Sequence, residues 1–126
     1  MAKILVVDDE AAIREMLQDM LGREGHEVTT AENGQHALSM FLEDQADIVI
    51  TNILMPEKEG LETIRELREM CPGVKIIAMS GGGQLGTINY LDVARSFGAM
   101  ETLTKPFTRQ RLIDALHDVL GAPAPS

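Results

Sequence analysis

The chain has 126 residues, a hydrophobic content of 44%, a charged content of 25% and a net charge of −9. This length supports one folded domain, and the composition is typical of a globular protein, which argues against a disordered chain. The negative charge argues against direct binding of nucleic acid or an anionic membrane by this domain, because both carry charge of the same sign.

The N-terminus leads directly from Lys3 into a strand pattern, without the regions of a signal peptide. No apolar run reaches the length of a membrane span, so no membrane association is expected. The single cysteine, Cys71, cannot form an internal disulfide, which fits a reducing compartment. Together these features predict a cytoplasmic protein.

Five short apolar segments are spaced along the chain and are predicted to be β-strands. They comprise residues 3–7, 27–31, 47–51, 75–80 and 100–104. The first, third and fourth are nearly continuous hydrophobic runs, as expected of central parallel strands that are covered on both faces. The second and fifth alternate more between apolar and polar residues, which favours positions nearer the edges of a sheet.

Amphipathic segments lie between and after these strands, and their 3.6-residue period predicts helices. The hydrophobic stripes span residues 13–21, 37–42, 61–67, 88–94 and 112–120. Residues that favour helix ends predict the boundaries. The first helix should end at Gly22 and Gly25, the third at Pro72-Gly73 and the fourth at Gly98. An Asn33-Gly34 turn should precede the second helix, and Thr108 should be the N-cap of the fifth. Regular strand–helix alternation predicts a doubly wound α/β fold with a parallel sheet and right-handed crossovers.

In such a fold, ligands bind at the carboxyl ends of the strands. The residues that follow the strands are Asp8 and Asp9, then Asn52, then Ser80 and Gly81, and finally Lys105 and Pro106. Two adjacent carboxylates at a buried edge repel each other unless a cation joins them, and Mg²⁺ suits such oxygen ligands. The alternative is that Asp8 and Asp9 only cap the first helix. A metal, a lysine and a hydroxyl at one edge would suit a phosphoryl group.

Four motifs in this chain carry a resemblance to a known family. They are Asp8-Asp9, Met55-Pro56 with Gly60 four residues on, Ser80-Gly81, and Lys105-Pro106-Phe107. The set resembles the receiver domain of bacterial two-component response regulators, as found in chemotaxis-type single receivers. The resemblance implies a five-stranded, flavodoxin-like sheet of order 2-1-3-4-5 with five helices. It implies a receiver domain over residues 1–120. Residues 121–126, Gly-Ala-Pro-Ala-Pro-Ser, cannot continue a helix and are predicted to be a tail or the start of a linker.

The resemblance also implies a role for each matching residue. Asp9 would bind Mg²⁺ directly, Asp8 would support it, and the Leu54 carbonyl and the residue at position 52 would complete the protein ligands. Ser80, Gly81 and Lys105 would contact the phosphoryl group. Pro106 is the candidate for a cis peptide bond.

The chain departs from the family pattern at two positions. Asn52 stands where receivers have the phosphate-accepting Asp, and an amide is not a nucleophile toward phosphorus. We therefore predict that residue 52 does not form an aspartyl-phosphate, and that Mg²⁺ is bound more weakly. Thr102 stands where receivers usually have Tyr or Phe, so an output based on movement of an aromatic ring is not expected.

Residues 81–86, Gly-Gly-Gly-Gln-Leu-Gly, also match the dinucleotide fingerprint G-x-G-x-x-G. The motif follows the fourth strand instead of the first, and too little chain remains for a second mononucleotide half. A loop that leaves Ser80 accessible is the preferred interpretation. The histidines, His26, His36 and His117, share no metal-ligand spacing.

Three functional hypotheses follow. The first is a phosphorelay receiver, not an enzyme, which partners a histidine kinase or phosphotransfer protein. Its output would pass to a protein or effector domain through the fourth helix, fifth strand and fifth helix. The second is a pseudo-receiver that binds proteins without phosphorylation. The third, a metal-dependent phosphotransferase, lacks a recognisable second nucleophile.

Overall fold

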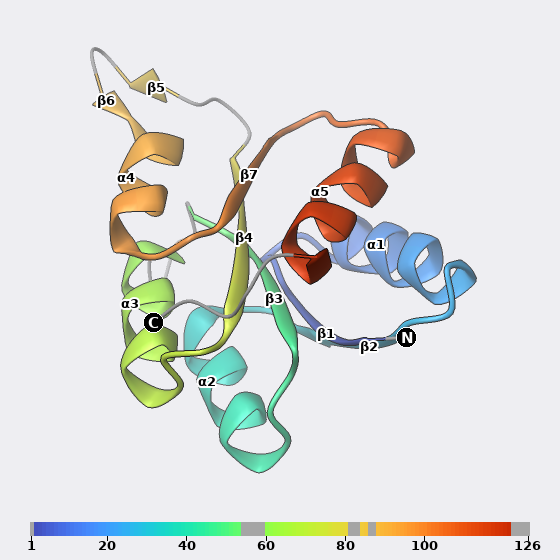
Figure 1. The fold of residues 1–126 in the computed structure, drawn as a ribbon, viewed down its shortest axis with the longest axis horizontal. Coiled ribbons are helices and arrows are strands. Elements are labelled where there is room, and N and C mark those ends of the chain that lie inside the picture. Colours follow the sequence, from blue (N-terminus) through green and yellow to red (C-terminus); the bar gives the residue numbers. More distant parts are fainter. Residues whose placement is uncertain (1, 54–59, 81–83, 86–87, 122–126) are drawn as a thin grey trace.

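The computed structural model describes residues 2–53, 60–80, 84–85 and 88–121, and it has one five-stranded parallel sheet with helices on both faces (Figure 1). The strands of the sheet are β1 (Lys3–Val7), β2 (Glu27–Ala31), β3 (Ile48–Asn52), β4 (Lys75–Ser80) and β7 (Glu101–Thr104). Their order is β2-β1-β3-β4-β7, which confirms the predicted 2-1-3-4-5 arrangement. The predicted strand 47–51 is displaced by one residue, and the predicted strand 100–104 begins one residue later, at Glu101.

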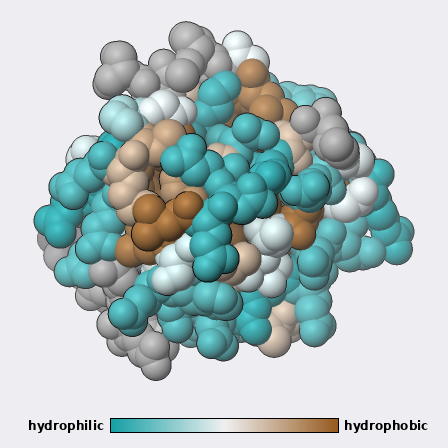
Figure 2. Space-filling view, turned by 90° about the horizontal axis from the view of Figure 1, so that it is seen from below, coloured by the Kyte–Doolittle hydropathy of each residue, from teal (hydrophilic) through white to brown (hydrophobic). Residues whose placement is uncertain are grey.

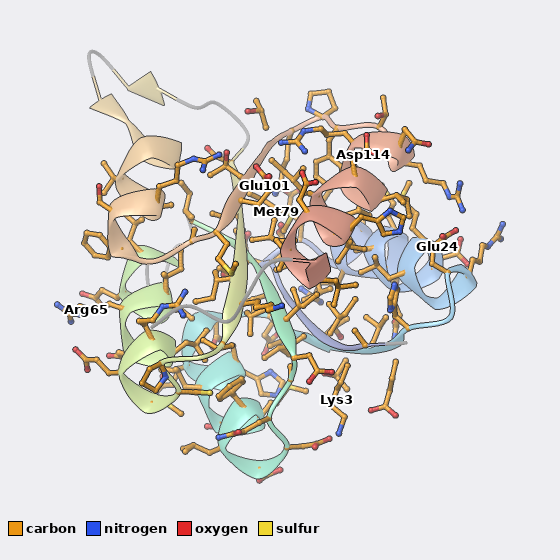
Figure 3. The ribbon with its side chains drawn as sticks, viewed as in Figure 1. Lys3, Glu24, Arg65, Met79, Glu101 and Asp114 are labelled. Carbon is orange, nitrogen blue, oxygen red and sulfur yellow. The ribbon has the colours of Figure 1, made fainter. Side chains whose placement is uncertain are left out.

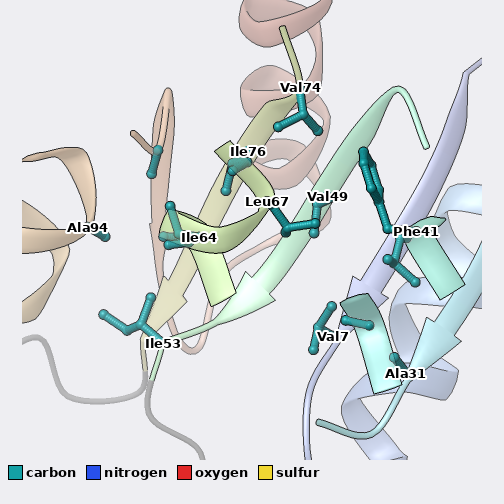
Figure 4. Packing of buried hydrophobic residues seen from close by; sticks show 14 residues of the cluster. Val7, Ala31, Phe41, Val49, Ile53, Ile64, Leu67, Val74, Ile76 and Ala94 are labelled. Carbon is teal, nitrogen blue, oxygen red and sulfur yellow. The ribbon is translucent and has the colours of Figure 1, made fainter. Parts of the chain in front are cut away.

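The helices are α1 (Ala11–Arg23), α2 (Gly34–Glu43), α3 (Gly60–Met70), α4 (Tyr90–Phe97) and α5 (Arg109–Gly121). Two hydrophobic clusters separate them into layers. Buried residues of α1 and α5, such as Leu17 and Leu116, pack on one face of the sheet. Buried residues of α2, α3 and α4, such as Phe41, Ile64 and Ala94, pack on the other face (Figure 4).

The central strands contribute side chains to both clusters. In β3, Val49 belongs to the cluster with α2 and α3, whereas Ile48 and Ile50 belong to the cluster with α1 and α5. All five residues of β3 are buried. This two-sided burial is the reason that the central strands read as continuous apolar runs.

Several helices begin or end at the residues predicted from the sequence. The Arg111 N–H donates to Thr108 Oγ1 at 3.0 Å, so Thr108 is the N-cap of α5. The Asn33 side chain accepts from the His36 N–H at 2.8 Å, so Asn33-Gly34 starts α2 directly where a separate turn was predicted. Gly98 follows α4 with a φ of +124°, a conformation that L side chains rarely adopt.

Three details of the prediction are wrong. Gly22 does not end α1, which continues to Arg23; only Gly25 has positive φ there, because a glycine can remain in a helix at modest cost. Ile88 does not belong to α4. It lies in β6 (Ile88–Asn89), which pairs antiparallel with β5 (Gln84–Leu85). Gly121 is the last residue of α5 and does not start the tail.

Figure 2 shows one face on which teal residues dominate and brown hydrophobic groups are confined to small areas. Large hydrophobic side chains with at least about a third of their surface exposed are Leu42, Met70, Phe97 and Leu120. Within the described residues, the helices are too short or too polar to cross a membrane.

Candidate functional site

The parallel register brings the ends of four strands to one edge of the sheet. Val7 pairs with Thr51, Asn52 pairs with Met79, and Ser80 pairs with Thr104. Asp8 and Lys105 come directly after the first and last of these strands. The structure therefore places Asp8, Asn52, Ser80 and Lys105 along the same carboxyl edge, as the sequence predicted.

Asp8 is the most enclosed charged residue of this edge. Its side chain is 0% exposed. Oδ1 accepts from the Glu10 N–H at 2.9 Å, and Oδ2 accepts from Lys105 Nζ at 2.7 Å. The residue does not cap α1 in the usual sense, because the N-cap position is Glu10 and no side chain bonds there. Both carboxylate oxygens of Asp8 therefore have a donor within the chain.

Lys105 connects the two ends of the sequence across the sheet. Its backbone N–H donates to the Ser80 carbonyl at 2.8 Å, which continues the β4–β7 pairing by one residue. Its side chain is 15% exposed and crosses to Asp8, 97 residues away in sequence. The Lys105–Pro106 peptide bond is cis, the isomer that the resemblance implied.

The two polar residues that end the central strands are both buried. Asn52, the last residue of β3, is 6% exposed, and Ser80, the last residue of β4, is 0% exposed. The Asn52 carbonyl accepts from Thr51 Oγ1 at 3.1 Å. An uncharged amide thus lies at the carboxyl end of the fully buried central strand, beside a strand that ends on a hydroxyl.

The remaining predicted ligands are less enclosed or lie outside the described residues. Asp9 is exposed. Leu54 and Gly81 fall outside the part of the chain that the structure describes. Among the described residues, no three His, Cys, Asp or Glu side chains are grouped so that they could hold a metal ion. The described residues of this edge thus offer the carboxylates of Asp8 and Asp9 and the amide of Asn52 as oxygen donors.

Gly60, the first residue of α3, lies directly against the end of β3. Its N–H donates to the Ile53 carbonyl at 3.0 Å. A Cβ at this position would overlap the Asn52 carbonyl oxygen and lie 2.5 Å from Ile53 Cα. Only glycine allows α3 to start this close to Asn52, which explains the glycine that carried part of the resemblance.

Arg14 is a site residue that the sequence reasoning missed. From the first turns of α1, its guanidinium donates to the Asp8 carbonyl at 2.8 Å. The helical stripe over residues 13–21 marked the apolar positions of α1 but gave no signal for Arg14, which is one of two polar residues between Ile13 and Met16. Two cations, Arg14 and Lys105, therefore contact Asp8, one at its backbone and the other at its side chain.

An apolar cavity lies next to the lysine. It has a volume of about 370 Å³ and is lined by Ile13, Met16, Lys105, Pro106 and Phe107. These residues come from α1 and from the segment between β7 and α5. Lys105 thus lines a cavity that it shares with residues of α1.

Thr102 lies in β7, next to Glu101, which Figure 3 labels and which forms ion pairs with residues of α4 and α5. Glu101 Oε1 lies 3.3 Å from the Arg95 guanidinium of α4 and 3.4 Å from the Arg111 guanidinium of α5. Arg111 also donates to the Thr102 carbonyl at 2.9 Å. Side-chain contacts thus connect α4, β7 and α5 around the small Thr102 residue.

Comparisons with known proteins agree with this architecture. The family model described as "Response regulator receiver domain" matches residues 4–117. The chemotaxis protein CheY of Thermotoga maritima is 36% identical over 118 residues, which cover 93% of this chain and 96% of that protein. CheY of Halobacterium salinarum is 37% identical over 123 residues, which cover 97% of this chain and 100% of that protein.

Solved structures show the same fold. A response regulator receiver domain protein from Clostridium thermocellum has a TM-score of 0.87 at 35% identity and covers 96% of this chain and 95% of its own. TrrA of Thermotoga maritima, solved in complex with Mg²⁺ and BeF, has a TM-score of 0.83 at 37% identity, with 94% and 99% covered. These matches cover nearly the whole chain.

Proposed function

Because the chain belongs to the response regulator receiver domain family of two-component signalling, we propose that it is a receiver whose phosphoacceptor position is Asn52. As written, it does not form a phosphoryl bond there, because an amide lacks the nucleophilic carboxylate. The observation that carries the proposal is the position of Asn52. It is buried at the carboxyl end of β3, at the same edge as Asp8, Ser80 and Lys105.

The residues of this edge have distinct proposed roles. Ser80, with the neighbouring Gly81, would donate hydrogen bonds to oxygens of a phosphoryl group. Lys105 would supply a positive charge to the same group. Gly60 keeps the start of α3 close to β3 and so holds the backbone of Asn52 in place. The edge thus has the groups that position a phosphoryl group but lacks the one that forms a bond with it.

The chemistry of the donor set fits Mg²⁺. Asp8 and Asp9 offer carboxylate oxygens, Asn52 an amide oxygen and Leu54 a backbone carbonyl, and hard oxygen donors are what Mg²⁺ prefers. TrrA, a relative of similar length, was solved with Mg²⁺ and BeF. When bound, the ion would neutralise negative charge at the carboxyl edge. The neutral Asn52 attracts a cation less than a carboxylate would, so binding is weaker than in a receiver with Asp at this position.

The proposed partners follow from the family. A histidine kinase or phosphotransfer protein would contact the carboxyl edge, and an output protein or effector domain would contact the surface formed by α4, β7 and α5. The Arg95–Glu101–Arg111 contacts and the partly exposed Phe97 of α4 give this surface both charged and apolar groups. The domain would act by binding its partners and not as an enzyme. It would do so in the cytoplasm.

A second candidate function is a pseudo-receiver that binds its partner without phosphorylation. The observation that favours it is the Lys105–Asp8 pair, which satisfies the buried carboxylate within the chain. A site that is complete in this way does not require a phosphoryl group for its stability. The two candidates differ in whether the site can still accept phosphate once a carboxylate is restored.

Reversion of Asn52 separates them. Incubated with a small phosphodonor and Mg²⁺, the Asn52→Asp variant should gain the mass of one phosphoryl group, while the unaltered chain should not. A matched control is Asn33→Asp, because Asp is equally suited to the N-cap of α2 and adds the same charge elsewhere. An unlabelled but folded Asn52→Asp variant would favour the pseudo-receiver. Labelling of the unaltered chain would contradict the assignment of the acceptor.

A further inference from the structure

The contacts of Asp8 raise the question of how a divalent cation would reach it. Its Oδ1 accepts from the Glu10 N–H at 2.9 Å and its Oδ2 accepts from Lys105 Nζ at 2.7 Å. The side chain is 0% exposed, so no oxygen faces bulk solvent. The lysine ammonium therefore occupies the space beside Oδ2.

Charge explains why the lysine lies there. Asp8 and Asp9 contribute two negative charges, Lys105 contributes one positive charge, and Asn52 contributes none. Burying Asp8 without a cation would be costly, since a buried carboxylate needs both a counter-charge and hydrogen bonds. With an amide at position 52, the carboxylate that receives the ammonium is Asp8.

We propose that Lys105 is a built-in competitor of the divalent cation, and that the two exclude each other at Asp8 Oδ2. This inference rests on the proposed function in one respect, the assignment of Asp8 to the metal set. In this chain, Mg²⁺ binds only when the ammonium leaves Asp8. The Lys105–Asp8 ion pair thus lowers metal affinity beyond the loss caused by the neutral Asn52.

The surroundings of Lys105 allow it to leave. Its side chain borders the cavity of about 370 Å³ that Ile13, Met16, Pro106 and Phe107 also line. Its stem can rest on this apolar surface while the ammonium reaches water, as lysine side chains commonly do. The backbone need not move, because the Lys105 N–H remains bonded to the Ser80 carbonyl at 2.8 Å.

Removal of the competitor tests the proposal. Lys105→Gln should tighten Mg²⁺ binding by about tenfold, since one positive charge is removed within a few ångströms of the ion. The affinity is measured by calorimetric titration with MgCl₂ and by the NMR shifts of the Asp8 and Asp9 amides. Lys75→Gln is the matched control. Its charge lies at the amino end of β4, at the opposite edge, where Lys75 Nζ is 3.5 Å from the Leu120 carbonyl, and the affinity should change by less than about twofold.

A second measurement avoids any folding defect of the variant. In the unaltered chain, titration with MgCl₂ should shift the side-chain NMR signals of Lys105 together with the Asp8 amide. Unchanged or weaker Mg²⁺ binding by folded Lys105→Gln would overturn the competition, as would an Asp8 shift without any Lys105 shift. Both results are independent of phosphorylation. The two proposals can fail separately. If Lys105→Gln binds Mg²⁺ more tightly while Asn52→Asp gains no phosphoryl group, the competition is supported and only the phosphoacceptor assignment is contradicted.

Discussion

At the scale of single residues, Arg68 makes hydrogen bonds that its neighbours in the sequence do not indicate. It lies in residues 65–69, a mostly charged segment of α3, and segments of this composition usually form an exposed helix face. Its guanidinium instead donates to the carbonyls of Pro72 at 2.8 Å and Val74 at 2.6 Å, and also to that of Gly98. Burial lowers the pKa of Arg68, but an arginine stays charged at neutral pH. One cation therefore connects the end of α3 to the start of β4 and to the turn after α4.

Removing this cation should destabilise the fold. Arg68→Met keeps most of the apolar stem but leaves three carbonyls without their donor, at a cost of about 1 to 3 kcal/mol in the free energy of unfolding. Urea denaturation followed by circular dichroism measures the change. Arg65→Met is the matched control, because Arg65 is exposed on the same helix and points away from the protein in Figure 3. Equal effects of the two substitutions would contradict the role assigned to Arg68.

At the scale of elements, the junction between β3 and α3 determines how closely a helix can approach the site. Gly60 begins α3, and its N–H bonds to the Ile53 carbonyl at 3.0 Å. The space that a Cβ would need is occupied by backbone atoms of Asn52 and Ile53, which cannot move aside as a flexible side chain could. The position of Asn52 thus depends on a residue in the next element.

Two glycine substitutions should therefore have opposite effects. Gly60→Ala should lower the free energy of unfolding by about 1 to 3 kcal/mol through overpacking. Gly22→Ala should raise it by about 0.5 kcal/mol, because Gly22 is helical, a new Cβ there has nothing within 4 Å, and alanine lowers the backbone entropy of the unfolded chain. Thermal or urea unfolding of both variants tests this pair. A neutral Gly60→Ala would mean that α3 can shift without cost.

At the scale of the whole molecule, stability comes from two hydrophobic layers that share the central strands. β1, β3 and β4 have hydrogen-bonded neighbours on both sides, whereas β2 lies at the edge and has partly exposed side chains. Asp8 follows β1, and Asn52 and Ser80 end β3 and β4, whereas Lys105 follows β7, the other edge strand. The carboxyl edge is therefore supported mainly by the central strands.

Amide hydrogen exchange should reflect this arrangement. The amides of β3 should exchange only through global unfolding, and those at the start of β2 should exchange much faster through local opening. NMR exchange in D₂O measures both sets in one sample. Equal protection of β2 and β3 would show that the sheet opens as one unit, with no difference between centre and edge.

Much of the fold could be predicted from the sequence because its signals are local. Continuous apolar runs marked β1, β3 and β4, and a threonine and a glycine marked the boundaries at Thr108 and Gly98. The β5–β6 pair was not predicted, since two-residue strands carry no periodic pattern. The contacts of Arg14 and Arg68 were missed for a related reason. Their partners are backbone carbonyls, and those carry no residue identity in the sequence.

The sequence by itself determined the type of sheet, the residues that follow each strand and the absence of a carboxylate at position 52. These properties depend on residue identity and spacing along the chain. Only the tertiary structure decided that Lys105 reaches Asp8 at 2.7 Å and that Gly60 leaves no room beside Asn52. Both are contacts between segments that are separated by other strands or helices or by a loop. Their geometry depends on sheet register and helix packing, which no local pattern encodes.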